Sequence, residues 1–517
     1  MRKLNTRKNR NPSLSAVIGG LLLPTLAFSA DEVRTDDSRQ QSDRPDILMI
    51  LVDDMGYGDM TVFRGDSPWT NLEPVPDSVR PPETPHLDAM AKGGMRLTDF
   101  YANSALCSPT RAALMTGRYQ HRSGVVSVLG QLGGAFRRVA EPGEEVFEGL
   151  RRDELTMAQV LRSGGYRTAM FGKWHLGGSQ NDFGDYHPMD YGFETYAGSP
   201  SWAGDNFSMR RDGESYFFRD RERVDAPGNW YTDVLADEAA EYLVDRSDGR
   251  PAFVYLSFTA PHVPFFGPGD KELGNAWDYS DRFGPREDRH RVYKEIIEGL
   301  DAAIGRLWES LEEAGVAENT LVFFASDNGP IDYGSAEPLR GRKTWLYEGG
   351  TRSPTFALWP AGIPAGSRTD EPTMTMDLLP TFAALAGAEI PAQRRLDGVD
   401  LSPLLRGEVR CLERRLLFWE QPIGVHIRHF TNRRWAVRDG HWKLLRERQG
   451  RPLELYNLDG DPREYKNVAD IYPDIVDRLE QAYREWREDV WSDAPYDREA
   501  FVERLKEHGL MDYDGLF

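Results

Sequence analysis

Apolar runs that stop abruptly at polar residues recur along this chain of 517 residues. The run Ile47–Val52 is apolar at every position, which is typical of a strand buried on both faces of a parallel sheet, and Asp53 and Asp54 follow it directly. Three later runs have the same design, with polar or titratable side chains just past their ends. They are Tyr166–Phe171 before Gly172-Lys173-Trp174-His175, Ala252–Phe258 before Ala260-Pro261-His262, and Leu321–Ala325 before Asp327-Asn328-Gly329.

Segments with helical periodicity alternate with these runs, at Leu155–Ser163, Tyr231–Asp245 and Arg291–Ala314. Strands that alternate with helices are typical of a doubly wound α/β domain, in which a mostly parallel central sheet is flanked by helices. In such sheets ligands bind beyond the carboxyl ends of the strands. We therefore expect the polar residues after the four runs to converge on one site.

The pattern changes after Leu401–Leu405 to short strand-like runs separated by turn residues, followed by an amphipathic segment from Tyr472 to Val490. We predict a larger domain over 45–405 and a smaller C-terminal α+β domain over 406–517, in which this segment forms a helix on an antiparallel sheet. The strands expected in that sheet are Leu416–Trp419, Trp435–Val437, Trp442–Leu445 and Leu453–Tyr456.

The N-terminus has the three parts of a cleaved secretory signal. Basic residues precede an apolar run from Leu14 to Phe28, and the segment ends in Ala27-Phe28-Ser29-Ala30. A membrane anchor is the alternative, but the run is short and glycine and proline interrupt it. We expect a signal peptide over 1–30, a polar leader over 31–44, and a mature protein that is secreted or periplasmic, with no membrane attachment.

Acidic residues outnumber basic ones, 83 to 63, which gives a formal net charge of −20. This balance makes nucleic acid an unlikely partner. It also repels anionic ligands, so a sulfate or phosphate site would need local cations to reverse the field. Arg111, Lys173 and Lys343 are the candidates.

The chain has two cysteines, Cys107 and Cys411, which in an exported protein could form a disulfide. The setting of Cys107 points elsewhere. Ser108 is a good N-cap, Pro109 suits a first helical turn and Gly117 can end the helix, so residue 107 should face the positive end of a short helix, where an anion is stabilised. If Cys107 serves that purpose, Cys411 is left unpaired, and we expect it to be a small buried side chain.

Asp53, Asp54, Asp327 and Asn328 offer only oxygen ligands, which select a hard cation. Ca²⁺ accepts such ligands flexibly, whereas Mg²⁺ demands tighter octahedral geometry, so we favour calcium. Taken alone, either dipeptide would more often begin a turn. Their shared position after matching strands favours a metal site.

Lys173 and His175 lie two residues apart after a predicted buried strand, and Gly172 and Gly177 would permit close approach of a ligand. His262 follows another strand, and its ordinary pKa suits proton transfer near neutrality. Each side chain alone would more often be structural. Their common place at the strand ends favours a catalytic role.

The segment Cys107-Ser108-Pro109-Thr110-Arg111, followed by Thr116-Gly117-Arg118, resembles the signature of the type I sulfatases, in which the cysteine is oxidised to formylglycine, an aldehyde. Other segments in family order also match from Pro45 to about Val490. Gly172–Gly177 resembles the family's G-K-W-H-L-G, Leu455–Pro462 resembles a C-terminal landmark, and Leu339–Arg352 resembles L-R-G-G-K-x-x-x-Y-E-G-G-x-R with Arg342 in place of a glycine.

The resemblance implies an alkaline-phosphatase-like fold and assigns roles to the residues in register. Asp53, Asp54, Asp327 and Asn328 would bind calcium, with residue 107 completing the shell. Lys173 would bind the sulfate, and His175 would move protons on the formylglycine. We expect Arg111, one helical turn from Cys107, to hold residue 107 by charge-assisted hydrogen bonds, and His262 with Lys343 to protonate the departing alkoxide.

The resemblance thus implies an exported sulfatase, matured by a formylglycine-generating enzyme and acting on a sulfated carbohydrate. The loops Gly124–Arg152, Gly177–Asn229 and Val263–Arg289 are long enough to shape a sugar site. A formylglycine phosphonate monoester or phosphodiester hydrolase is the nearest alternative, and an inactive glycan-binding relative is a more remote one. A zinc phosphatase is disfavoured because its histidine-rich ligand set is missing.

Overall fold

The computed structural model describes residues 44–65, 81–130, 135–136, 139–140, 147–178, 182–201, 205–211, 213–226, 228–271, 283–284, 286–421, 434–448 and 450–508. The predicted signal peptide, and the predicted leader apart from Arg44, lie outside the described residues. Within them, no helix combines the length and apolar character needed to cross a bilayer.

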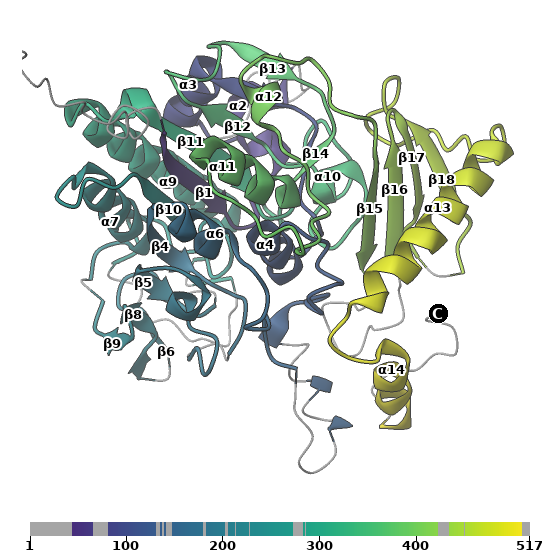
Figure 1. Cartoon of the computed structure of the whole chain (residues 1–517), viewed down its shortest axis with the longest axis horizontal. Helices are drawn as coiled ribbons and strands as arrows, with labels where there is room; N and C mark the ends of the chain where they lie inside the picture. Colours follow the sequence, from purple (N-terminus) through teal and green to yellow (C-terminus); the bar gives the residue numbers. More distant parts are fainter. Residues whose placement is uncertain are drawn as a thin grey trace, which may run out of the picture. The chain divides into compact units, whose positions relative to one another are not determined.

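A central sheet of ten strands carries the fold (Figure 1). Its middle is parallel, because β1 pairs in parallel with β10 and β11, β10 with β4, and β4 with β5. Both edges are completed mainly by antiparallel pairs. In sheet order the strands are β13 (Ser367–Thr369), β2 (Met95–Leu97), β12 (Phe356–Leu358), β11 (Thr320–Ser326), β1 (Asp46–Val52), β10 (Ala252–Ser257), β4 (Arg167–Lys173), β5 (Thr195–Ser199), β8 (Phe217–Arg219) and β9 (Glu222–Val224).

Helices cover both faces of this sheet. Alternate residues of β1 enter two different cores, Ile47 and Met49 on one face and Leu48 and Ile50 on the other, so the strand is buried on both sides. Helices α4 (Cys107–Thr116), α6 (Met157–Ser163) and α11 (Leu378–Ala386) line the first core, and α3 (Pro85–Gly93), α7 (Tyr231–Val244) and α9 (Arg289–Glu313) line the second. The predicted doubly wound α/β architecture is confirmed.

The C-terminal part forms an antiparallel sheet in the order β15 (Leu416–Gln421), β16 (Arg434–Asp439), β17 (Trp442–Arg446) and β18 (Glu454–Asn457). Helix α13 (Pro473–Ser492) packs on it as predicted, and the Tyr483 ring stacks on Trp435 at 4.2 Å. The domain boundary expected after residue 405 stays a prediction.

A further helix, α14 (Arg498–Glu507), was not expected from the sequence. Its Phe501 and Leu505 are buried in the first core of the central sheet, and Phe501 stacks on Phe136 at 3.8 Å. The remaining elements are short: Tyr57–Asp59, α2 (Thr61–Arg64), β3 (Phe100–Tyr101), Pro188–Tyr191, β6 (Arg210–Arg211), β7 (Glu214–Ser215), Ala317–Asn319, α10 (Glu348–Thr351), β14 (Thr373–Met374), Thr375–Asp377 and α12 (Ser402–Leu405).

Candidate active site

Cys107 is the first residue of α4 and is buried, with 2% of its surface exposed. The helix begins two residues earlier than predicted: Leu106, not Ser108, occupies the N-cap position, and the Ser108 hydroxyl instead accepts a hydrogen bond from the Leu129 amide at 3.3 Å. Gly117 ends the helix in the left-handed conformation, as predicted, with φ of 65°. A short buried helix thus starts at the residue proposed to react.

Cys107 and Cys411 are both free thiols, so the disulfide alternative is wrong for this structure. The expectation that Cys411 would be buried is also wrong, because its side chain is exposed. It lies in the segment between α12 and β15, where its neighbour Leu412, and not Cys411, packs against the first core.

The four predicted strand ends converge around Cys107. Lys343 brings its Nζ to 3.3 Å from the Cys107 Sγ and to 2.5 Å from Asp54 Oδ1. Lys173, at the end of β4, lies 2.5 Å from Asp53 Oδ2 at the end of β1. Two ammonium groups therefore flank the two carboxylates, which supplies the local cations that an anion site in this acidic protein requires.

Arg111 takes a different set of partners from the one predicted. Its guanidinium binds Asp327 Oδ2 at 2.8 and 3.1 Å and lies 3.8 Å from Asp53, all fully buried. It also donates to the Ser257 hydroxyl at 2.5 Å and the Tyr255 hydroxyl at 3.4 Å. The sequence reading missed Ser257 and Tyr255, although a polar residue at the end of the apolar run Ala252–Phe258 was a visible signal.

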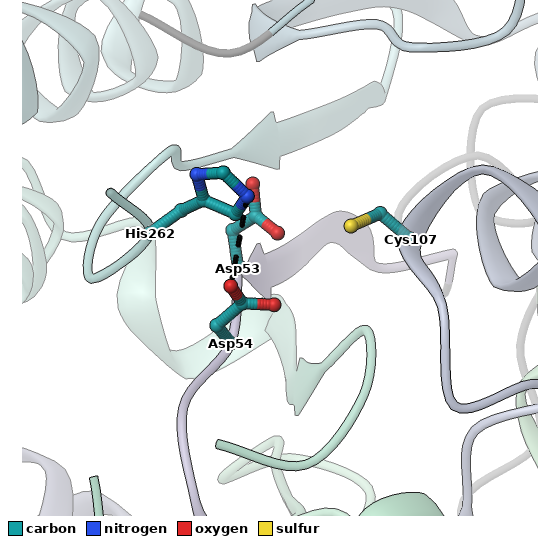
Figure 2. A group of neighbouring side chains, drawn as sticks. All are labelled: Asp53, Asp54, Cys107 and His262. Carbon is teal, nitrogen blue, oxygen red and sulfur yellow. Dashed lines mark ion pairs between the residues drawn. The ribbon is translucent and has the colours of Figure 1, made fainter. Parts of the chain in front are cut away.

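Asp53, Asp54, Cys107 and His262 each bring one possible metal-ligand atom into a group whose members lie within 4.8 Å of one another (Figure 2). Among the described residues, three buried oxygens near this group lack a hydrogen-bond partner: Asp53 Oδ1, Asp54 Oδ2 and Asn328 Oδ1. Burying such atoms without a partner is costly, and a hard cation would satisfy all three. The residues therefore fit the expected ion.

The other two predicted metal ligands, Asn328 and Asp327, already have hydrogen-bond partners in the site. Asn328 donates its amide Nδ2 to Asp54 Oδ1 at 2.7 Å, which leaves its oxygen available. Asp327 has one oxygen held by Arg111, and the other accepts the Asp54 amide at 3.3 Å. Its role as a metal ligand stays a prediction, and in this geometry it orients Arg111 and the Asp54 backbone.

The surroundings of both predicted catalytic histidines favour the neutral form of the imidazole ring. Burial, with Lys173 and Arg111 beside it, holds the pKa of His175 well below its ordinary value. Burial also lowers the pKa of His262, against the opposing pull of Asp53 and Asp54. The His262 Nε2 lies 3.6 Å from Asp54 Oδ2, and its Nδ1 lies 2.6 Å from the Val263 carbonyl oxygen, which orients the ring.

The surroundings of Cys107 shift the pKa values of its thiol and of the neighbouring ionisable groups in different directions. Burial raises the pKa of the Cys107 thiol to about 12 despite the two lysines, so the unmodified side chain is a protonated thiol near neutral pH. Burial alone would raise the pKa of Asp53, but Lys173 and the other cationic groups around it, His262, Arg111 and Lys343, together outweigh burial and hold that pKa well below its ordinary value. Burial alone would lower the pKa of Lys343, but Asp54, together with Cys107, Asp53 and Asp327, outweighs burial and raises it, so Lys343 keeps its proton.

Backbone strain gathers at the site. Asp54 and His175 have φ of 72° and 57°, a left-handed conformation that side chains other than glycine rarely adopt. Thr344, next to Lys343, has φ of 76°. The Trp345 amide donates to the Arg342 carbonyl at 2.9 Å, so residues 342–345 form a β-turn with Thr344 third, where glycine is usual.

Neighbouring elements hold this strained turn. The Thr344 amide donates to the Ala105 carbonyl at 3.0 Å, two residues before Cys107. From the C-terminal sheet, Arg434 donates to the Thr344 carbonyl and forms an ion pair with Glu447 at 2.9 Å, and Glu447 accepts the Leu346 amide at 3.2 Å. Residues far apart in the sequence thus fix the backbone beside Lys343.

Comparisons with known proteins agree with this site. A family model described as Sulfatase matches residues 45–388, and one described as N-sulphoglucosamine sulphohydrolase, C-terminal, matches residues 341–489. N-acetylgalactosamine-6-sulfatase of Homo sapiens is 32% identical over 413 residues, which cover 75% of this chain and 71% of that protein. Arylsulfatase A of Bos taurus is 32% identical over 487 residues, covering 85% and 86%.

Among solved structures, Ps i-CgsB in complex with k-i-k-neocarrahexaose matches with a TM-score of 0.72 at 26% identity, covering 90% of this chain and 98% of that one. The phosphonate monoester hydrolase of Agrobacterium radiobacter matches with a TM-score of 0.58 at 20% identity over 86% and 96%, a likeness of fold alone. Because the sulfatase model spans well over half of the 517 residues, this chain belongs to the sulfatase family and is a hydrolase of sulfuric esters.

Proposed function

We propose that this protein removes sulfate from a sulfated carbohydrate after Cys107 has been converted to formylglycine by a formylglycine-generating enzyme. The observation that carries the proposal is the placement of Cys107 at the start of a buried helix, with the Lys343 ammonium 3.3 Å from its sulfur. A buried thiol with a pKa of about 12 is a poor nucleophile, which supports conversion to another group.

Formylglycine and calcium, when present, supply a nucleophilic hydroxyl and a Lewis acid that offsets the charge of the sulfate oxygens. Asp53, Asp54, Asn328 and Asp327 would hold the ion. Lys173 lies beside Asp53 and Lys343 beside Asp54, and both ammonium groups would bind the sulfate oxygens. Arg111 is fully buried between Asp327 and Asp53, so it orients these carboxylates.

Proton transfer would be shared among three side chains. Lys343 carries a proton in the resting site, while His262 is neutral, so the proton for the departing oxygen would start on Lys343 and could pass through His262 Nε2. His175 is also neutral, and its Nδ1 has no hydrogen-bond partner among the described residues. It would accept a proton from the group at position 107 in the second half of the reaction.

A carbohydrate substrate is supported by the relatives. The structure with a TM-score of 0.72 was solved with an oligosaccharide, k-i-k-neocarrahexaose, and N-acetylgalactosamine-6-sulfatase is named for a sulfated sugar. Steryl-sulfatase of Mus musculus, 32% identical over 488 residues, is named for a sterol ester and represents the competing substrate class. We favour the carbohydrate because the expected signal peptide would send the enzyme to extracellular polysaccharides.

The test is release of inorganic sulfate, followed by ion chromatography, from carrageenan, chondroitin sulfate, heparin and a steryl sulfate. The protein is co-expressed with a formylglycine-generating enzyme, and mass analysis confirms the state of residue 107. Release from one of the polysaccharides, absent in Cys107→Ala, is expected. If the aldehyde is confirmed and only steryl sulfate or a phosphonate ester is hydrolysed, the carbohydrate assignment is wrong.

Two further parts of the proposal have direct measurements. Chelation with EDTA should abolish sulfate release, and Ca²⁺ should restore it better than Mg²⁺ if the flexible oxygen set selects calcium. Export predicts that the mature protein begins at or near Asp31, which N-terminal mass analysis of protein from the culture medium or periplasm will show.

A further inference from the structure

A cleft of about 1410 Å³ is lined by residues between Phe136 and Tyr186 and between Pro495 and Arg504. One of its walls is the segment from Phe147 to Asp153, in which the Leu150 amide donates to the Leu176 carbonyl at 2.8 Å and Gly149 pairs with Gly177. Gly177 is two residues from His175, so this wall is bonded directly to the backbone of the catalytic segment.

The opposite wall comes from the unpredicted helix α14. Phe501 and Leu505 point into the core, while Ala500 and Arg504, each one position earlier and four residues apart, face the cleft. Tyr496 precedes the helix and donates its hydroxyl to the Gly124 carbonyl at 3.1 Å. The helix lies beyond residue 489, where the match to the C-terminal family model ends.

Aromatic and charged side chains share the lining. The rings of Tyr186 and Tyr496 provide flat, partly apolar surfaces with polar tips. Three arginines and three aspartates also line the cleft, so its formal charge is balanced, whereas the whole chain carries 20 more acidic than basic charges. Among these, Arg151 and Arg152 remain 50% and 55% exposed.

We propose that this cleft binds a stretch of the substrate's carbohydrate chain remote from the sulfate ester that is cleaved. Arg151 and Arg152 would donate to hydroxyl or sulfate oxygens, and the tyrosine rings would pack on sugar faces. The volume exceeds that of an ordinary small-molecule pocket, which suits several linked sugars. This inference rests on the proposed function and adds a second, polymer-binding region to it.

Arg152→Ala is the most informative variant, because its loss leaves no carboxylate without an ion pair, and the Asp185 carbonyl to which it also donates at 2.6 Å belongs to an exposed residue. Arg152 binds Asp190 at 3.2 Å, and Asp190 keeps a second ion pair with Arg221 at 2.6 Å. Arg210→Ala is the matched control: Arg210 is 46% exposed and paired with Asp225, but it does not line the cleft. Arg151→Ala repeats the test at a second position whose partner, Asp153, is a near neighbour in sequence.

Kinetics are measured on the sulfated polysaccharide that the wild-type enzyme desulfates and on p-nitrophenyl sulfate, which reaches only the catalytic centre. Arg152→Ala should raise KM for the polymer about tenfold and leave p-nitrophenyl sulfate turnover unchanged, since a charge-assisted hydrogen bond is lost. Equal changes on both substrates, or no change on either, would overturn the inference.

Affinity electrophoresis in gels containing carrageenan or chondroitin sulfate separates this inference from the proposed function. If wild-type protein is retarded and Arg152→Ala migrates faster, the cleft binds carbohydrate. A wild-type enzyme that hydrolyses p-nitrophenyl sulfate but neither binds nor desulfates any polysaccharide would refute both ideas. One that desulfates a polysaccharide as well with Arg152→Ala as without would refute the cleft alone.

Discussion

At the scale of single residues, adjacent positions differ sharply in what they contact. Lys343 is 14% exposed and touches both Asp54 and Cys107, while Arg342 is 52% exposed and pairs only with Asp332 among the described residues. Buried charge near a reacting group acts strongly because little water screens it, whereas an exposed ion pair contributes little. We therefore expect replacement of Lys343, but not of Arg342, to lower the activity.

Lys343→Ala should lower kcat for p-nitrophenyl sulfate by about a hundredfold or more, because a preorganised cation at the reacting group is lost. The fold should survive, since Asp54 Oδ1 keeps its hydrogen bond from Asn328 at 2.7 Å. Circular dichroism and steady-state kinetics on the modified enzyme measure both effects.

Arg342→Gly, which installs the residue that the resembled sulfatases carry, is the control and should retain wild-type kcat. A fall in kcat comparable to that of Lys343→Ala would show that the position next to the lysine has acquired a catalytic task in this chain.

At the scale of elements, the C-terminal sheet supports the active site through β16 and β17. Arg434, the first residue of β16, donates to the Thr344 carbonyl, and its partner Glu447 follows β17 directly and binds the Leu346 amide. A second link is fully buried: Lys443 on β17 binds Glu348 of α10 at 2.8 Å and Glu464 at 3.0 Å. The sheet thus holds the segment from Thr344 to Glu348, which directly follows Lys343.

Arg434→Ala should reduce kcat for p-nitrophenyl sulfate by about tenfold or more while changing KM little, because small displacements of a catalytic group are costly. At pH 8, where Glu447 is ionised, it should also cost about 2 kcal/mol of stability by leaving that carboxylate without its ion-pair partner. Arg446→Ala, on the neighbouring strand, removes an ion pair with Glu480 and a contact over Trp435 without touching the turn. If both variants lose kcat equally, the sheet acts through stability alone.

Glu447 also gives the sheet a measurable pH dependence. Burial raises its pKa to about 7 from the ordinary 4.5, so the folded state holds a proton that the unfolded state releases. Its contribution to stability is therefore present below about pH 4.5 and is lost as the pH rises to about 7, by about 3 kcal/mol over that window.

Glu447→Gln removes this titration. The stability of the wild-type protein relative to the variant, measured by urea unfolding at several pH values, should decline from pH 5 to pH 8. A difference that stays constant over that range would contradict the assignment.

The sequence predicted the elements whose own residues form a recognisable pattern of apolar and polar positions. Continuous apolar runs marked β1, β4, β10 and β11, since strands buried on both faces need no polar alternation. The short strands β2, β12 and β13 were missed because three residues are too few to show a periodicity. The expectation that polar residues converge at the carboxyl ends of the strands correctly brought Asp53, Lys173 and Asp327 together. The contact of Arg434 with Thr344 joins residues 90 positions apart, and no local sequence pattern predicts it.

At the scale of the whole molecule, α14 ties the C-terminal end of the described chain back onto the central sheet. Its pattern, Arg498-Glu-Ala-Phe-Val-Glu-Arg-Leu-Lys-Glu507, is mostly charged, which is why the sequence alone gave little reason to expect a packed helix. Nearby, Arg122 binds Asp397 at 2.8 Å and Asp489 of α13 at 2.5 Å, so ionic contacts reinforce the same junction. We expect the buried ring of Phe501 to contribute most of the stability of this junction.

Phe501→Ala should destabilise the protein by about 3 kcal/mol or more, because a ring with 1% exposure that stacks on Phe136 leaves a cavity. Below the melting temperature, kcat for p-nitrophenyl sulfate should stay at the wild-type value, since α14 contributes no residue to the catalytic centre. KM for the polymer should rise, because Arg504 and Ala500 would lose their fixed place in the cleft wall.

Phe501→Leu, which keeps most of the apolar volume, should restore much of the stability and of the affinity for the polymer. A melting temperature that falls while both substrates keep their KM would show that α14 stabilises the fold without shaping substrate binding.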